Sequence, residues 1–258
     1  MTMELVVLGS GTVAPSAHRT APAHWVSAGG VRLLLDCGAG MLHRAARHAV
    51  PWPDVTHVAV THFHPDHWGE LPMLLFALTW GTLPARSALL RVIGPAGLQT
   101  RMTVLAGALG DWVLEPGYPL QIEEIAPGES LELSGDVRLE AWKTPHTDES
   151  LAYAVRNAQA RLVYTGDTGP SETLARWAQG CDLLLSECSL PDDQAIAIHL
   201  SPTQAGVLAR AAGARRLVLT HFYPAIEATD PTSVAARAFG GEVLAANDGD
   251  RFTIGADG

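Results

Sequence analysis

The chain has few positive charges. Its 258 residues include 17 Lys and Arg against 27 Asp and Glu, so the formal net charge is −10 at pH 7. Proteins that wrap long polyanions need clustered basic residues, and this composition argues against a long nucleic acid as partner. A small anionic substrate remains compatible with an acidic chain, because a bound metal ion can dominate the local field.

Cysteines and long apolar runs are also scarce. The three cysteines, Cys37, Cys181 and Cys188, are odd in number and form no C-x-x-C pair, which argues against a disulfide framework. No apolar stretch approaches the length of a membrane span, and the amino-terminal residues lack a basic signal segment. We therefore expect a cytoplasmic protein that makes no membrane contact.

Short apolar runs instead alternate with helix-like segments. Residues 5–8, 31–35 and 183–185 are bounded by Gly or Asp, as buried strands usually are. The strand-then-helix rhythm recurs in both halves, and 47% hydrophobic residues can supply a substantial core. We predict one α/β domain over residues 1–258, with two pseudo-halves, roughly 1–115 and 116–258, and two packed sheets with helices outside.

Four candidate metal ligands lie within six positions, directly after an apolar run. His62 and His64 are two residues apart at a strand end and should point to the same side, while Pro65 can open a helix that brings Asp66 and His67 to a neighbouring point. Imidazole and carboxylate donors suit zinc, although manganese, iron or cobalt also fit such a site. The turn thus predicts two adjacent divalent ions.

This turn resembles the H-x-H-x-D-H signature of the metallo-β-lactamase superfamily. Later motifs follow in the family's order, with His146 in Thr-Pro-His-Thr, Asp167 in Thr-Gly-Asp-Thr and His221 in Leu-Thr-His-Phe. Asp36 in Asp-Cys-Gly resembles the acidic motif that supports the metal loop. The resemblance covers nearly the whole chain and implies a four-layer αββα sandwich, with two mixed sheets packed face to face.

The same resemblance implies a set of seven ligands for the two ions, with zinc as the first expectation. One ion would lie among His62, His64 and His146 and the other among Asp66, His67 and His221, and Asp167 would bridge both. Two ions about 3.5–4 Å apart lower the pKa of a shared water. The bridging hydroxide would then be the nucleophile, and Asp66 would orient it.

Further motifs resemble the ribonuclease Z branch and its small phosphodiesterase relatives. They are Leu-Gly-Ser-Gly-Thr near the amino terminus, Ser-Glu-Cys around Glu187, and His-Leu-Ser beginning at His199. In that branch the matching Glu and His act beside the phosphate. Glu187 and His199 therefore join Asp66 as catalytic candidates, and His199, positioned by Glu187, would protonate the leaving alkoxide or bind the phosphate.

Departures from the branch narrow the substrate. Ribonuclease Z proper carries a long arm that grips transfer RNA, whereas only residues 147–166 separate His146 from Asp167, and His221-Phe-Tyr-Pro lacks the usual Arg-Tyr ending. Processing of transfer RNA 3′ ends is therefore the less favoured alternative. Small members, including cyclic-nucleotide phosphodiesterases of the anti-Pycsar type, act as homodimers. The resemblance thus implies a homodimeric phosphodiesterase for a small phosphodiester, with a cyclic nucleotide as the first expectation.

Two other classes of function stay open. A dimetal site attacks carbonyl carbons equally well, so a hydrolase of lactones, thioesters or β-lactams is an alternative, against which Glu187 and His199 argue. A nonenzymatic ligand sensor would require lost metal chemistry, whereas every expected ligand position is filled. His18, His24 and the seven tryptophans receive no assigned role, and residues such as Trp80 could serve an entrance, the core or a dimer surface.

Overall fold

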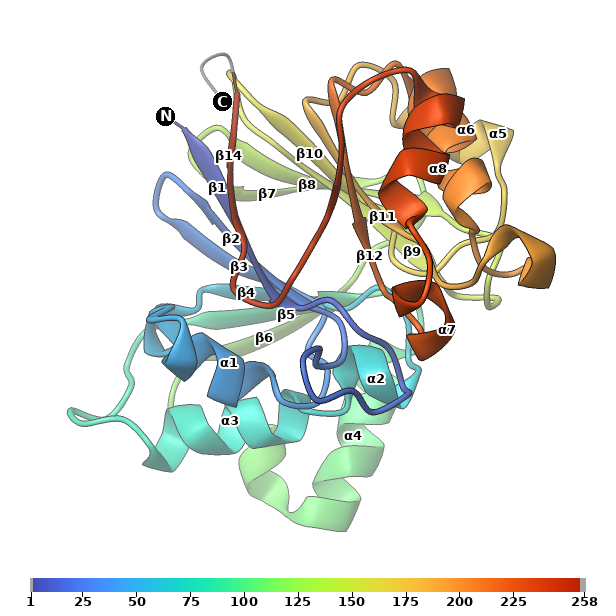
Figure 1. Ribbon diagram of the computed structural model, residues 1–258. Coiled ribbons are helices and arrows are strands. Elements are labelled where there is room, and N and C mark those ends of the chain that lie inside the picture. Colours follow the sequence, from blue (N-terminus) through green and yellow to red (C-terminus); the bar gives the residue numbers. More distant parts are fainter. Residues whose placement is uncertain (1, 256–258) are drawn as a thin grey trace.

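Two seven-stranded sheets face each other, and helices cover their outer sides (Figure 1). The structure is a computed structural model that describes residues 2–255. The first sheet has, in spatial order, β14 (Arg251–Ile254), β1 (Met3–Gly9), β2 (Ala23–Ala28), β3 (Val31–Leu35), β4 (His57–Ala59), β5 (Leu90–Gly94) and β6 (Leu120–Glu124). The second has β13 (Val243–Ala245), β12 (Arg216–Thr220), β11 (Leu183–Glu187), β10 (Arg161–Tyr164), β9 (Leu151–Arg156), β8 (Val137–Lys143) and β7 (Ser130–Ser134).

Each sheet mixes antiparallel and parallel pairs. Strands β1, β2 and β3 run antiparallel, whereas β3 to β6 are parallel. In the second sheet β7 to β10 are antiparallel and β10 to β13 are parallel. After β6 the chain crosses from the first sheet to the second at residues 125–129. Its last strand, β14, returns to the first sheet and pairs with β1.

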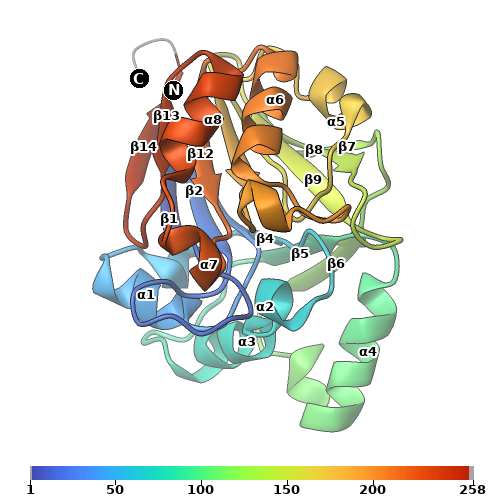
Figure 2. The ribbon, with the colours of Figure 1, turned by 45° about the vertical axis from the view of Figure 1, so that its right-hand side comes forward.

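Helices form the two outer layers. The first sheet is covered by α1 (Met41–Arg47), α2 (Pro65–Trp68), α3 (Leu71–Trp80) and α4 (Leu98–Leu109), and the second by α5 (Glu172–Trp177), α6 (Pro202–Ala212), α7 (Pro224–Glu227) and α8 (Pro231–Phe239) (Figure 2). Short 3-10 turns are η1 (Trp52–Asp54), η2 (Asp111–Val113) and η3 (Asp192–Gln194). Among residues 2–255, no helix combines the length and apolar character needed to cross a bilayer.

Local sequence accounts for several of these elements. The hairpin between β2 and β3 turns at Gly29, whose φ of 56° is easy only for glycine. At α6, Ser201 accepts from the Gln204 backbone and the Gln204 side chain accepts from the Ser201 backbone, which is a capping box, with Pro202 at the first helical position.

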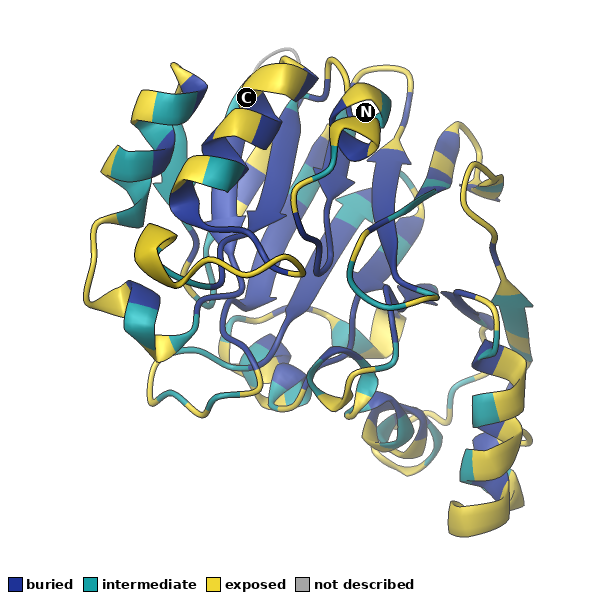
Figure 3. Cartoon of the chain, turned by 90° about the vertical axis from the view of Figure 1, so that its right-hand side faces the viewer, coloured by how far each residue is buried: buried dark blue, intermediate teal, exposed yellow. Residues whose placement is uncertain are grey.

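The buried layers explain why the four-layer sandwich forms. One apolar cluster, including Leu5, Leu33 and Leu185, lies between the two sheets. A second separates the first sheet from α1, α3 and α4, and a third separates the second sheet from α5, α6 and α8. Figure 3 shows the central strands of both sheets largely buried, whereas the edge strands β6, β7 and β13 are mostly intermediate or exposed and the helices turn an exposed side outward. The predicted αββα architecture is therefore confirmed.

Candidate metal centre

The site lies where parallel strands of both sheets end. The carboxyl ends of parallel strands meet at one edge of a sheet, which is where such folds place their ligands. The loop after β4 supplies the His62–His67 turn, the loop after β10 supplies Asp167, and β12 leads into His221. His146 comes from the turn between β8 and β9. The sandwich therefore brings together ligands separated by up to 159 positions, from His62 to His221.

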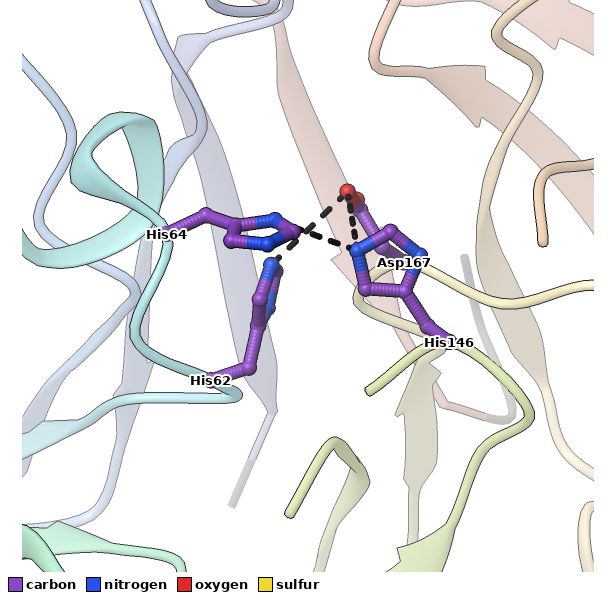
Figure 4. Close-up of side chains that lie close together, drawn as sticks. All are labelled: His62, His64, His146 and Asp167. Atoms are coloured by element: carbon purple, nitrogen blue, oxygen red, sulfur yellow. Dashed lines mark hydrogen bonds and ion pairs between the residues drawn. The ribbon is translucent and has the colours of Figure 1, made fainter. Parts of the chain in front are cut away.

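The first group contains His62, His64, His146 and Asp167, whose ligand atoms all lie within 4.8 Å of one another (Figure 4). His146 Nε2 is 3.2 Å from His64 Nδ1 and 3.6 Å from Asp167 Oδ2. His62 Nε2 is 3.9 Å from the same carboxylate oxygen. A tetrahedral ion with ligand bonds of about 2.0–2.2 Å separates its ligands by about 3.4 Å, so these distances fit one ion.

The second group contains Asp66, His67 and His221. The Nε2 atoms of His67 and His221 lie 3.2 and 3.3 Å from Asp167 Oδ1, and 3.9 and 3.7 Å from Asp66 Oδ2. Asp167 therefore turns one oxygen to each group. This is the arrangement that a carboxylate shared by two ions requires.

Unpaired atoms inside the two groups provide a test of that fit. His62 Nε2, His67 Nε2, His221 Nε2 and Asp167 Oδ1 are buried and have no hydrogen-bond partner among the described residues. Buried polar atoms without a partner are costly, and all four point to where the ions would lie. Burial and then the charge of His67 hold the pKa of His62 well below its ordinary value, which keeps that ring neutral and able to ligate.

In His62, His146 and His221 the second ring nitrogen, Nδ1, has a protein partner. His62 Nδ1 lies 3.1 Å from Thr61 Oγ1, and His221 Nδ1 lies 2.8 Å from Ser189 Oγ. His146 Nδ1 lies 3.0 Å from the Ile198 carbonyl oxygen. Since a carbonyl only accepts, His146 must carry its proton on Nδ1, which leaves Nε2 as the ligand atom.

Asp36 is the hydrogen-bond partner of Nδ1 in His67. Its fully buried carboxylate accepts from His67 Nδ1 at 2.7 Å, from Tyr164 Oη at 2.8 Å, and from the backbone and hydroxyl of Thr61 at 2.7 and 2.9 Å. Asp36 and His221 both have positive φ, 58° and 61°. Such backbone is uncommon outside glycine and collects at functional sites.

Glu187 and His199 lie beside this centre. Glu187 is fully buried and accepts from His199 Nδ1 at 3.0 Å, from the Thr168 backbone at 2.6 Å and from Ser189 Oγ at 2.5 Å. His199 Nδ1 is 4.0 Å from Asp167 Oδ2. Burial opposes the protonated ring, but the hydrogen bond and charge of Glu187 outweigh it, so the pKa of His199 lies above its ordinary value. Within residues 2–255, the hydrogen bonds of the His199 ring all involve Nδ1.

The structure also identifies supporting residues that sequence reasoning missed. Thr61 and Ser189 contact the candidate ligands His62 and His221, and Tyr164 donates to Asp36, yet Thr, Tyr and Ser carry no distinctive spacing. A usable signal existed only for Thr61, which adjoins His62. Position 166 requires glycine, because its φ is 54° and a Cβ there would lie 2.9 Å from Thr61.

Two histidines without an assigned role have different surroundings. His18 is exposed. His24 is fully buried on β2, with its ring edge-on to Tyr164 at 4.7 Å, and neither ring nitrogen has a hydrogen-bond partner among the described residues. Burial, aided by the charges of His67 and His221, lowers the pKa of His24 to about 3, so this ring is neutral.

The family model described as "Beta-lactamase superfamily domain" matches residues 31–222. Ribonuclease Z of Mycobacterium marinum (strain ATCC BAA-535 / M) is 30% identical over 98% of this chain and 99% of its own length. Ribonuclease Z of Mycobacterium bovis (strain BCG / Pasteur 1173P2) is 29% identical over 98% of both chains.

Solved structures share the fold over nearly the full chain. The metallo-beta-lactamase fold protein YhfI from Bacillus subtilis has a TM-score of 0.83 and 25% identity, covering 98% of this chain and 100% of its own. The short form of human tRNase Z has a TM-score of 0.80 and 23% identity, with the same coverage. Zinc-bound PqqB from Methylobacterium extorquens has a TM-score of 0.73 and 16% identity, covering 96% of this chain and 99% of its own.

Proposed function

The chain belongs to the metallo-β-lactamase superfamily, in its ribonuclease Z-like branch, and from this premise we propose that it hydrolyses a small phosphodiester, with a cyclic nucleotide as the substrate class. It is a dinuclear metal hydrolase of the ribonuclease Z and phosphodiesterase type. The proposal depends on the position of the Glu187–His199 pair beside the two groups. His199 Nδ1 lies 3.0 Å from Glu187 Oε1 and 4.0 Å from Oδ2 of Asp167, the carboxylate between the groups.

The metal ligands proposed here are the seven residues of the two groups. His62, His64 and His146 would hold one ion, Asp66, His67 and His221 the other, and Asp167 lies between the two groups with one oxygen toward each. Five imidazoles with two carboxylates favour zinc. When bound, the two ions lower the pKa of a water molecule and offset the charge that builds on the phosphoryl oxygens.

His199 then acts on the leaving group. Because Glu187 accepts from Nδ1, the proton on Nε2 of the charged ring can pass to the departing ribose oxygen as the phosphorus–oxygen bond breaks. An alkoxide that leaves without a proton is costly, and general acid catalysis of this kind contributes about 10²–10⁴-fold. Glu187 positions the ring and stabilises its charge.

The space beside the metal centre suits a compact substrate. A pocket of about 360 Å³ adjoins Asp66 between residues 12–16 and Pro65, and its walls are mostly small side chains. This volume lies in the range of small-molecule sites, about 300–1,000 Å³. Between His146 and Asp167 the chain forms only β9, β10 and their turns, which leaves no arm there for gripping a folded RNA.

The test is turnover by the metal-replete protein of bis(p-nitrophenyl) phosphate and of 2′,3′- and 3′,5′-cyclic nucleotides. Asp66→Ala, which removes a proposed ligand, should abolish turnover. His199→Ala should lower kcat by about 10²–10⁴-fold while both ions stay bound. Wild-type turnover by His199→Ala on every phosphodiester would remove the proposed role of His199. No turnover by a protein with two verified ions would remove the phosphodiesterase proposal.

A second candidate is transfer RNA 3′ processing, which is favoured by the 29–30% identity to proteins named ribonuclease Z along nearly their whole length. Precursor transfer RNA should therefore be assayed beside the cyclic nucleotides, at equal enzyme concentration. Endonucleolytic cleavage at the 3′ trailer without turnover of any cyclic nucleotide would decide for this candidate. A lactone, a thioester and a β-lactam in the same assay test the carbonyl alternative.

For assembly we propose a homodimer that pairs through α3. Its ten residues contain no charged side chain, so pairing through α3 brings no like charges of that helix into direct contact. Met73, Phe76 and Trp80, spaced along one stripe, are 54%, 43% and 56% exposed. Light scattering should give twice the chain mass, and Trp80→Glu the mass of one chain. Val207→Glu on α6, also exposed, is the matched control, and a monomeric wild type would contradict the proposal.

The cytoplasmic location stays a prediction. It is supported by Cys37, Cys181 and Cys188, all of which are buried and unpaired, as expected of a chain that folds in a reducing compartment.

A further inference from the structure

The chain contains a single lysine among its 17 basic side chains, Lys143, and it ends β8 three residues before His146. Its ammonium donates to the Thr144 carbonyl at 2.7 Å and to the Thr147 carbonyl at 2.5 Å. These two carbonyls lie on either side of His146 in the sequence. The lysine therefore connects the backbone on both sides of His146, a proposed metal ligand.

The turn that carries His146 is also held by hydrogen bonds among its own residues, since the Thr144 backbone donates to Ser150 O at 3.1 Å and the Thr147 backbone to Ser150 Oγ at 2.8 Å. Residues 144–150 belong to no helix or strand, and Pro145 is exposed. The His146 backbone donates to Thr144 O, and the Ser150 backbone donates to Thr147 O at 3.4 Å, a long contact. Both carbonyls that Lys143 bridges thus also take part in the turn's own hydrogen bonds, so the ammonium fixes both ends of the turn at once.

The same turn is hydrogen-bonded to the backbone of the segment that carries Asp167. Thr144 Oγ1 donates to the Asp167 carbonyl at 2.9 Å, and the Gly169 backbone donates to Pro145 O at 3.0 Å. The His146 ring is held from its far side by Ile198 O. A shift of the turn would therefore move His146 away from His62 and His64, whereas Asp66, His67 and His221 lie on other elements.

We propose that Lys143 is a positioning residue for the metal centre, which holds His146 in place for the ion shared with His62 and His64. The inference rests on the ligand set proposed above. A compact ammonium with three donors suits two converging carbonyl oxygens better than a planar guanidinium does. Loss of a partner that touches a ligand directly costs about 10–100-fold in metal affinity. Lys143 acts through the backbone on either side of His146, and its loss should fall on one ion of the two.

The experiment measures metal rather than turnover. Zinc-replete wild type and Lys143→Met are dialysed against graded concentrations of a chelator, and zinc per chain is determined by mass spectrometry. We expect Lys143→Met to lose one zinc at a chelator activity at least tenfold lower than the wild type requires, and to keep the other as the wild type does. Lys143→Arg, which retains the charge and the donors, should lie between them. Arg138→Met removes an exposed cation from the same strand and should match the wild type.

Three results would overturn the inference. They are retention of both ions by Lys143→Met with wild-type affinity, equal weakening of both ions, and failure of both Lys143 variants to fold, which would make the lysine a structural residue only. Thermal unfolding of the metal-free proteins separates the last case. A wild type that binds fewer than two ions would instead refute the proposed dimetal function, so the two failures are distinguishable.

Discussion

Substitution of Asp36 by Asn tests how the protein interior sets the metal centre. Asn is nearly the same size and tolerates the positive φ of 58° at this position, so the backbone should be kept. The carboxylate accepts with both oxygens, since Oδ1 takes the Thr61 backbone N–H and Oδ2 takes His67, Tyr164 and the Thr61 hydroxyl.

An amide cannot satisfy both sides. If its oxygen replaces Oδ2, its NH₂ faces the Thr61 N–H across 2.7 Å. If it turns over, the NH₂ faces His67 Nδ1 across 2.7 Å, and the ring can no longer donate there. Either orientation loses at least one hydrogen bond to a charged acceptor, which is worth about 1.5–3 kcal/mol. Asp36→Asn should lower the free energy of unfolding by about that amount and weaken the second ion by about 10–100-fold.

The assays are urea unfolding of the metal-free protein and zinc affinity by competition with a chelator. Asp193→Asn, on the exposed turn η3, is the control and should leave both quantities unchanged. If Asp36→Asn bound both ions as tightly as the wild type, the argument that Asp36 fixes His67 would be refuted, whatever happened to stability.

Three further outcomes are expected. His24→Phe should raise the unfolding free energy by about 1–3 kcal/mol, because it removes two buried nitrogens that lack a partner among the described residues, and a lower thermal midpoint would contradict this. Ser189→Ala removes the acceptor of His221 Nδ1 and should weaken the ion held by Asp66 and His221 about 10–100-fold while the other ion stays, as zinc titration can show. Removing zinc should lower the thermal midpoint, since free metal at about 1,000 times its Kd stabilises the folded state by about 4 kcal/mol, and calorimetry with and without chelator checks this.

Much of the fold followed from local pattern. The helix that opens at Pro65 was predicted from the sequence and is present. The hairpin at Gly29 and the helix after Ser201 likewise depend on a few neighbouring residues. Two packed sheets with outer helices were expected from the strand-then-helix rhythm, and the four-layer αββα sandwich from the family resemblance. The return of the last strand, β14, to the first sheet was not expected. It pairs with β1 and so joins residues about 250 positions apart, and no local periodicity indicates the sheet edge at which a last strand pairs.

The candidate site also has one part that the sequence predicts and one part that it does not. The spacing of His62, His64, Asp66 and His67 is a property of one turn, so the sequence by itself determined that these side chains converge. Only the tertiary structure decided which atoms face the ions, because His146, Asp167 and His221 arrive from the ends of distant strands. It also assigned Thr61, Tyr164 and Ser189 as supports and made Lys143 a contact of the His146 turn. Those residue types are common, and a hydrogen bond between distant segments depends on packing that spacing along the chain does not record.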